Sequence, residues 1–237
     1  MRLRCHGAAA SAASGSAWIQ VGRTQVVCGV YGPREQQTGR AAFSADGTLT
    51  CELSFAPFAA APGARKERDA LRAERQDLSA AVRRALEPSV QLHRFPKSVL
   101  DVFVLVLQDD GSVLPAAVTC AAAALAAAGV ELYDVAAGCA SAQLPGGAVV
   151  LDPDAAQEAE AEALWNVALL PASGNLSDVA LCGRTGFDAG GVAVAAALRG
   201  CLQRHQLVRE RLLAEHRAQQ RELERCGAVA AVHLYKF

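Results

Sequence analysis

The sequence predicts an α+β domain in which mixed sheets pack against helices. Short runs of β-branched and apolar residues, separated by glycine and proline turns, fill the first part of the chain. Residues 48–55 alternate apolar and polar side chains, which is typical of a strand with one buried face. Two helical patterns interrupt the strands, one amphipathic over 67–87 and one almost entirely alanine over 116–128. This order favours a layered α+β or mixed α/β domain.

Composition allows one large domain. The 237 residues are 52% hydrophobic and 20% charged, so the chain can bury a sizeable core. No internal repeat or strong linker divides it, and we expect an N-terminal extension over 1–14 and a single domain over 15–237. The formal net charge of −1 argues against a free-standing nucleic-acid binder, although a subunit could still add a few arginines to a shared RNA path. The apolar runs 99–107 and 115–130 are too short or too broken to span a bilayer.

The first elements form a predicted hairpin. Residues 17–21 and 24–31 are apolar and β-branched on either side of a Gly22-Arg23 turn. Gly32-Pro33 is expected to end the second strand, and 36–45 reads as a loop.

The middle of the chain predicts an amphipathic helix followed by a strand. Pro88 ends the helix over 67–87. Residues 99–107 are nearly all apolar apart from Asp101, which predicts a central strand covered on both faces. The helix over 67–87 carries its large apolar side chains on one stripe, formed by Leu71, Leu78, Val82 and Leu86.

The alanine-rich helix has no polar face, so we expect it to be buried against a sheet. Pro115 suits its first turn and Gly129 its C-terminal end. After it, the sequence predicts a hairpin over 135–144 and 148–151, then strands over 165–170 and 176–181.

The last segment, 190–226, reads as a long helix or helix pair. Eight cysteines are spread over the chain, and none forms a CxxC pair. Several lie in apolar runs, so we expect reduced, buried core thiols and no metal site. Cys201 and His205 fall four residues apart on the last helix, but two ligands do not make a zinc site.

Several short segments, taken together and in order, resemble the RNase PH-like subunits of the eukaryotic RNA exosome ring. Within that family the resemblance is strongest to the Mtr-type subunits, and the alternative is the catalytic-type lineage. The matches lie between about residues 15 and 182, and each is weak alone while their order is specific. They are GSAWIQVGRT at 15–24, VYGPR at 30–34, RFPKS at 94–98, VLQDDGSVL at 106–114 and AAGVELYD at 127–134.

This resemblance implies a ribosomal-protein-S5-domain-2-like fold. It also implies a ring of six such subunits around a central RNA channel, with cap subunits carrying S1 and KH domains on top. The expected partners are therefore the other ring subunits, a cap subunit and RNA. The expected role is RNA degradation and processing, including rRNA processing, in the nucleus, nucleolus and cytoplasm, with no cofactor and no membrane.

The resemblance also predicts a lost active site. Active members carry a Gly-Thr-Arg-like run that holds the attacking phosphate, and Ser112, Val113 and Leu114 stand in its place. An aliphatic side chain at the arginine position provides neither charge nor donor. Leu164 stands where active members carry the catalytic Asp, with Glu162 nearby. We therefore expect a non-catalytic subunit, the alternative being an active phosphate-dependent 3′–5′ exoribonuclease, alone or through a site shared with a partner.

Basic residues in loops are the candidates for RNA contact, because phosphates need only a few cations at the right radius. The alternative is that the helix arginines pair with neighbouring acidic residues on a solvated face. A third reading, an unrelated alanine-rich protein, would be disfavoured if 48–55 shared a sheet with 17–31. The candidates are Arg65, Lys66, Arg68, Arg94 and Lys97.

Overall fold

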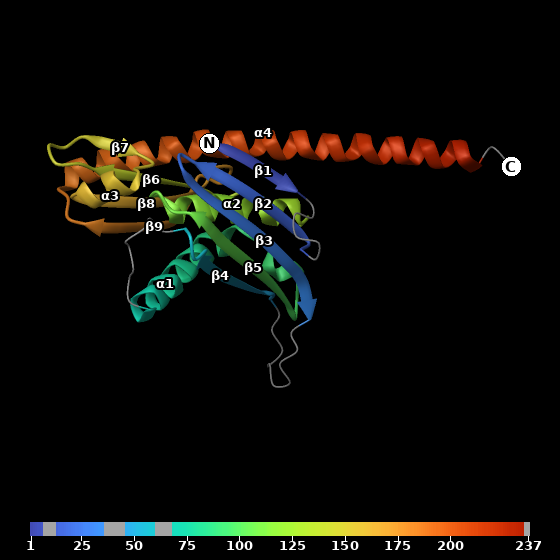
Figure 1. The fold of residues 1–237 in the computed structure, drawn as a ribbon, viewed down its shortest axis with the longest axis horizontal. Helices are drawn as coiled ribbons and strands as arrows, with labels where there is room; N and C mark the ends of the chain where they lie inside the picture. The colour runs from blue at the N-terminus through green and yellow to red at the C-terminus, as the bar shows by residue number, and fades with distance from the viewer. Residues whose placement is uncertain (7–12, 36–45, 60–67, 235–237) are drawn as a thin grey trace.

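The computed structural model describes residues 1–6, 13–35, 46–59 and 68–234. Two sheets lie on either side of a central helix, and a long C-terminal helix covers the outer face of the second sheet (Figure 1). The α+β prediction is therefore confirmed.

The first sheet has five strands in the order β1-β2-β3-β5-β4. Neighbouring strands are antiparallel except for the parallel pair β4–β5. The strand over 48–55 shares this sheet with the hairpin over 17–31, which disfavours an accidental resemblance. The predicted extension over 1–14 contributes the edge strand β1. The strands are β1 (Arg2–His6), β2 (Gly15–Val21), β3 (Thr24–Glu35), β4 (Thr48–Phe55) and β5 (Ser98–Gln108).

Strand β3 does not end at Gly32-Pro33, as the sequence predicted. It continues to Glu35, which pairs with Ser98 of β5. A register shift between Tyr31 and Arg34 takes up the proline, which has no N–H to donate to the ladder.

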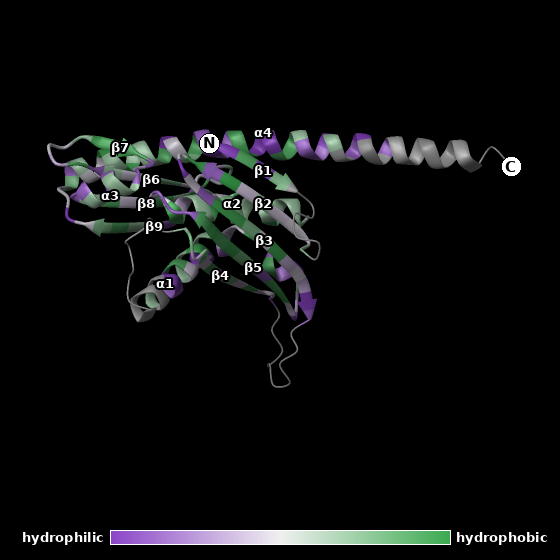
Figure 2. Ribbon diagram, viewed as in Figure 1, coloured by the Kyte–Doolittle hydropathy of each residue, from purple (hydrophilic) through white to green (hydrophobic). Residues whose placement is uncertain are grey.

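The prediction that β5 is covered on both faces is wrong. Val102, Val104 and Val106 are buried, but Phe103 and Leu105 on the other face are 43% and 39% exposed. In the described part of the chain the helices pack against the inner face of this sheet, so the strand alternates between core and solvent. Figure 2 shows strongly hydrophobic residues along β3 and β5, and this apolar run on both faces misled the prediction.

The second sheet has four antiparallel strands in the order β7-β6-β8-β9. Every residue of β6 is buried, because α2 packs on one side and α4 on the other. The predicted hairpin and the two later strands are confirmed. The strands are β6 (Ala137–Gln143), β7 (Val149–Leu151), β8 (Ala163–Leu170) and β9 (Asn175–Gly183).

The central helix α2 (Val113–Ala127) contacts β2 and β3 on one side and β6 and β8 on the other. Its side chains from Pro115 to Leu125 are all buried, as the missing polar face predicted. Alanine allows both sheets to approach closely. One close approach is at Gly138 of β6, where an added Cβ would lie 2.8 Å from the Cα of Pro115.

The remaining helices lie around these layers. The amphipathic helix α1 (Arg68–Leu86) packs on β4, and two 3₁₀ turns, Glu87–Ser89 and Leu92–Arg94, follow it. A short helix, α3 (Ala155–Glu160), precedes β8. The final helix α4 (Phe187–Leu234) is one continuous helix of 48 residues, not a pair, and its end projects past the sheets (Figure 1).

Five of the cysteines have buried, unbridged thiols, as predicted; they are Cys5, Cys28, Cys120, Cys139 and Cys201. Burial raises the pKa of the Cys5, Cys139 and Cys201 thiols to about 12, so they stay protonated at neutral pH. Within the described ranges, no three potential metal ligands gather and no helix has the length and hydrophobicity to cross a membrane.

Candidate phosphate site

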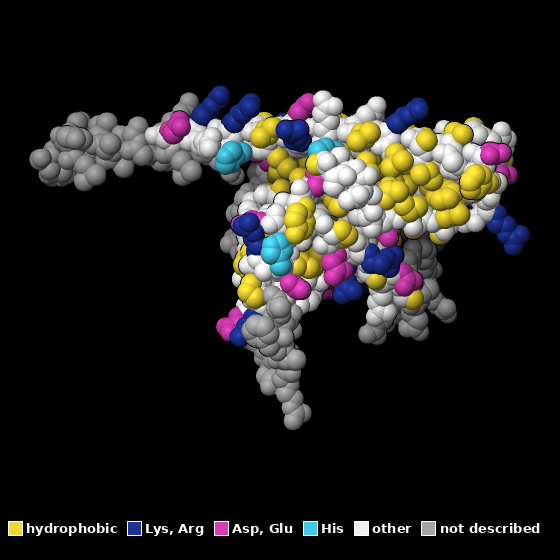
Figure 3. All heavy atoms as spheres, turned by 180° about the vertical axis from the view of Figure 1, so that it is seen from behind, with side chains coloured by type: hydrophobic (Ala, Val, Ile, Leu, Met, Phe, Trp, Pro, Cys, Tyr) yellow, Lys and Arg dark blue, Asp and Glu magenta, His cyan; other side chains and the backbone are white. Residues whose placement is uncertain are grey.

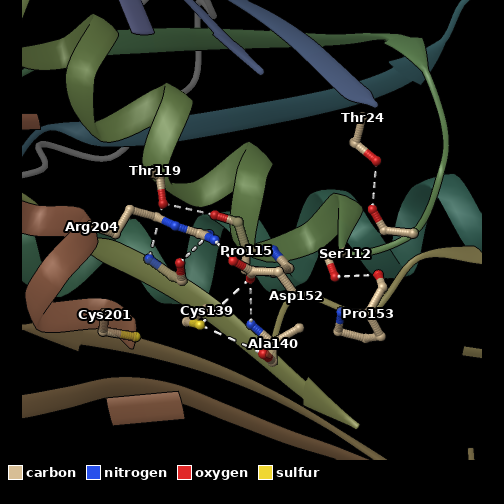
Figure 4. A network of polar contacts seen from close by, with 12 residues as sticks. Thr24, Ser112, Pro115, Thr119, Cys139, Ala140, Asp152, Pro153, Cys201 and Arg204 are labelled. Atoms are coloured by element: carbon tan, nitrogen blue, oxygen red, sulfur yellow. Dashed lines mark hydrogen bonds and ion pairs between the residues drawn. The ribbon is translucent and has the colours of Figure 1, made fainter. Parts of the chain in front are cut away.

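The turn between β5 and α2 is held rigidly. The hydroxyl of Thr24 donates to the carbonyl of Gly111 at 2.7 Å, and the amide of Asp110 donates back to that hydroxyl at 3.1 Å. Ser112 has a left-handed backbone with φ of 53°, and its hydroxyl donates to the carbonyl of Pro153 at 2.9 Å (Figure 4). These bonds fix the start of α2 against β3 and against the segment that precedes α3.

A carboxylate lies at the start of α2. The backbone N–H of Ser112 donates to Oε1 of Glu158, from α3, at 2.7 Å. Burial raises the pKa of Glu158 above its ordinary value of 4.5, the Ser112 N–H lowers it, and the charges of Asp109 and Asp154 raise it. A helix N-terminus attracts anions, and here one of its free N–H groups already bonds a negative side chain.

Val113 and Leu114 provide only aliphatic surface. Leu114 lines a cavity of about 10 Å³, at the lower limit for a single water molecule. No Arg or Lys is among the side chains around it. The other lining residues are Ala85, Pro115, Val118, Asn166, Val167, Ala168 and Asp178.

Leu164 lies on β8, paired with Ala142 on one side and Cys182 on the other. Asn166, two residues further along, is on the same face of the strand and lines the cavity beside Leu114. The fold thus brings the face of β8 that carries Leu164 toward the start of α2. Glu162 is exposed, and its backbone bonds to Gln143 and to the residue that follows β9.

The predicted RNA-contact residues lie elsewhere. Arg94 ends the second 3₁₀ turn and Lys97 precedes β5, so the length of β5 separates both from the turn that precedes α2. The Arg94 guanidinium forms an ion pair with Glu131. Arg65 and Lys66 lie outside the described residues, as does the side chain of Arg68, the first residue of α1. Contact with RNA stays a prediction for all five residues.

Sequence reasoning missed one polar network. Arg204 of α4 is 5% exposed, donates to the carbonyl of Gly138 and forms an ion pair with Asp152 (Figure 4). Asp152 also accepts a 3.5 Å bond from the amide of Ala140. One signal was present, because Arg204 continues a buried helical stripe at spacings of three and four residues, Ala193, Ala197, Cys201 and Val208.

Replacing Glu158 by Gln is expected to change the free energy of unfolding more favourably at neutral pH than in acid, relative to the unmodified protein. The pKa of Glu158 is raised in the folded protein, so folding favours the protonated carboxyl group. This stabilisation is fully present below the ordinary value of 4.5 and is lost as the pH rises through the raised value. Gln keeps the acceptor for the Ser112 N–H and does not titrate. Urea unfolding at about pH 4 and pH 7 measures the effect. A stability difference between variant and unmodified protein that is independent of pH would contradict it.

Comparison with known proteins identifies the family of the chain. The family described as "3' exoribonuclease family, domain 1" matches residues 2–131. The chain is 37% identical to the human exosome complex component MTR3 over 217 residues, covering 86% of this chain and 79% of that protein. It is 33% identical to exosome complex component Rrp41 of Thermococcus kodakarensis over 202 residues, covering 84% and 79%.

Two solved structures share the fold. Rice Rrp46 has a TM-score of 0.73 at 22% identity and covers 89% of this chain and 94% of its own. A chain of the Archaeoglobus fulgidus exosome with RNA bound to the active site has a TM-score of 0.69 at 19% identity, covering 85% and 86%. The sequence matches and the shared fold place the chain in the RNase PH-type 3′ exoribonuclease family, as a relative of the exosome components MTR3 and Rrp41.

Proposed function

We propose that this protein is a non-catalytic structural subunit of the RNA exosome core ring. In this role it helps to form the central channel for 3′–5′ RNA processing and degradation and supports a cap subunit, in the nucleus, nucleolus and cytoplasm. The support for ring membership is its similarity to proteins named as exosome components, MTR3 and Rrp41, over more than four-fifths of the chain.

One observation carries the non-catalytic part of the proposal, namely what surrounds the start of α2. Phosphorolysis needs a cationic pocket that holds phosphate in line with the RNA phosphodiester, and an acid for the leaving oxygen. Leu114 and a cavity of about 10 Å³ take the place of that pocket, and the carboxyl group of Glu158 already accepts the N–H of Ser112 at the start of the same helix. Leu164 carries no proton to donate.

An exposed apolar surface supports the assembly part. Figure 3 shows hydrophobic side chains gathered over the end of the molecule that holds the second sheet and the start of α4. Apolar patches of this kind mark protein contacts. Phe187 is 97% exposed there and lines an apolar groove of about 620 Å³ together with Trp165 and Leu181. The other exposed apolar residues of these elements include Leu176, Val179 and Val192.

The test is a phosphorolysis assay on the purified chain and on a reconstituted ring, with single-stranded RNA and inorganic phosphate. We expect no nucleoside diphosphate release from the chain alone, and no change in the ring when Glu162→Gln is introduced. Native mass spectrometry checks that the ring still assembles. Release by the chain alone, or release by the ring that is lost with Glu162→Gln, would show that the site is active, as in the alternative reading.

A further inference from the structure

The segment that follows α2 presents an exposed aromatic side chain on a hydrogen-bonded backbone. Tyr133 is 62% exposed, yet its amide donates to the carbonyl of Ser89 at 2.8 Å. The residue before it, Leu132, forms a β-bridge with Val90 and accepts a bond from the side chain of Gln91 at 3.3 Å. The backbone below the ring is therefore fixed although the ring faces solvent.

A second ring extends this surface. His93 stacks on Tyr133 with ring centroids 6.2 Å apart and an angle of 29° between the planes. The tyrosine hydroxyl and Nδ1 of His93 are 3.4 Å apart, which holds the two rings in this orientation. Aromatic rings at this separation attract one another, so the pair is preorganised to receive a further flat group.

Two cationic residues lie close to His93 in the chain. Arg94 follows His93 directly, and Lys97 follows three residues later. The carboxylate of Glu131 forms an ion pair with Arg94, and both side chains are about half exposed. An incoming phosphate would compete with Glu131 for a guanidinium that has five N–H donors.

We propose that Tyr133 and His93 form a stacking platform for one base of single-stranded RNA, with Arg94 and Lys97 contacting the neighbouring phosphates. Aromatic stacking combined with cations that follow the backbone is the usual basis of single-strand binding without sequence preference. The neighbours Gln91, Arg94 and Glu131 are polar or charged, which favours RNA over an apolar protein partner. The proposal rests on the proposed function, since a ring around a channel gives the platform its RNA.

The test is fluorescence anisotropy with a labelled oligouridylate of about twelve nucleotides, using the full chain and the reconstituted ring. Tyr133→Ala is expected to weaken binding by about 5- to 100-fold, and Tyr133→Phe by less than about twofold because the ring remains. Arg94→Met is expected to weaken binding and to reduce the salt dependence by about one counterion. Glu131→Gln is expected to strengthen binding, because it releases Arg94.

Phe58→Ala is the matched control, since it removes an aromatic ring that is 73% exposed and lies beyond the end of β4. It is expected to leave RNA affinity unchanged. Equal affinity for Tyr133→Ala and the unmodified protein would overturn the proposal, as would no binding by the unmodified protein in either setting. Loss of ring assembly with Tyr133→Ala, without a change in RNA affinity, would identify a protein contact instead. Phosphorolysis by the chain would count against the proposed function but leave the platform standing.

Discussion

Replacing Arg204 by Met is expected to lower the free energy of unfolding by about 3–5 kcal/mol. Arg204 is almost fully buried, and its removal leaves Asp152 without its ion-pair partner and the carbonyl of Gly138 without a donor. A charge that has lost its partner in a poorly solvated site is costly, whereas the intact pair contributes little by itself. Urea unfolding followed by circular dichroism measures the loss.

Two controls separate the broken pair from the lost side chain. Arg199→Met removes an exposed arginine from the same helix and is expected to change stability by less than about 0.5 kcal/mol. Adding Asp152→Leu to Arg204→Met is expected to recover part of the loss, because no unpaired charge then remains. Equal effects of Arg204→Met and Arg199→Met would rule out a structural role for the pair.

Replacing Ala121 by Leu is expected to lower the free energy of unfolding by about 1–3 kcal/mol. Ala121 is fully buried in α2, and both sheets pack against this helix. A larger side chain there must displace a strand or leave its preferred rotamer. The midpoint of urea unfolding measures the change, provided that the slope of the transition stays the same.

Ala127→Leu is the matched substitution near the other end of the same helix. Ala127 lines an open groove of about 350 Å³ beside α4, so the added carbons have room. We expect its effect to be smaller than about 0.5 kcal/mol. If both substitutions destabilised the protein equally, helix propensity rather than close packing would be the cause.

Local patterns were enough to predict most of the elements. The alternation over 48–55 and the turn at Gly22 gave the strands, and the missing polar face of 116–128 gave the buried helix. The exposed face of β5 escaped prediction, because Phe103 and Leu105 are apolar and face solvent. Burial there depends on which face the helices cover, and that is a property of the whole fold.

The site was predictable only in part, for a similar reason. Val113 and Leu114 can be read from a continuous segment, because it resembles the phosphate turn of the family. Glu158 could not be predicted, since its bond to Ser112 joins residues 46 positions apart in the chain. Arg204 and Asp152 are likewise 52 positions apart. The first pairing depends on how α3 meets the start of α2, and the second on how β6 and β7 meet α4.

The position of α2 between the sheets has a consequence for cooperativity. Each sheet buries its inner face against the same alanine-rich helix, so neither can complete its core while the helix is undocked. Partial unfolding that releases one sheet would expose the side of α2 that packed against it, and loss of α2 would uncover the other sheet as well. The two sheets are therefore expected to unfold in one all-or-none transition, even though no strand pairing joins them among the described residues.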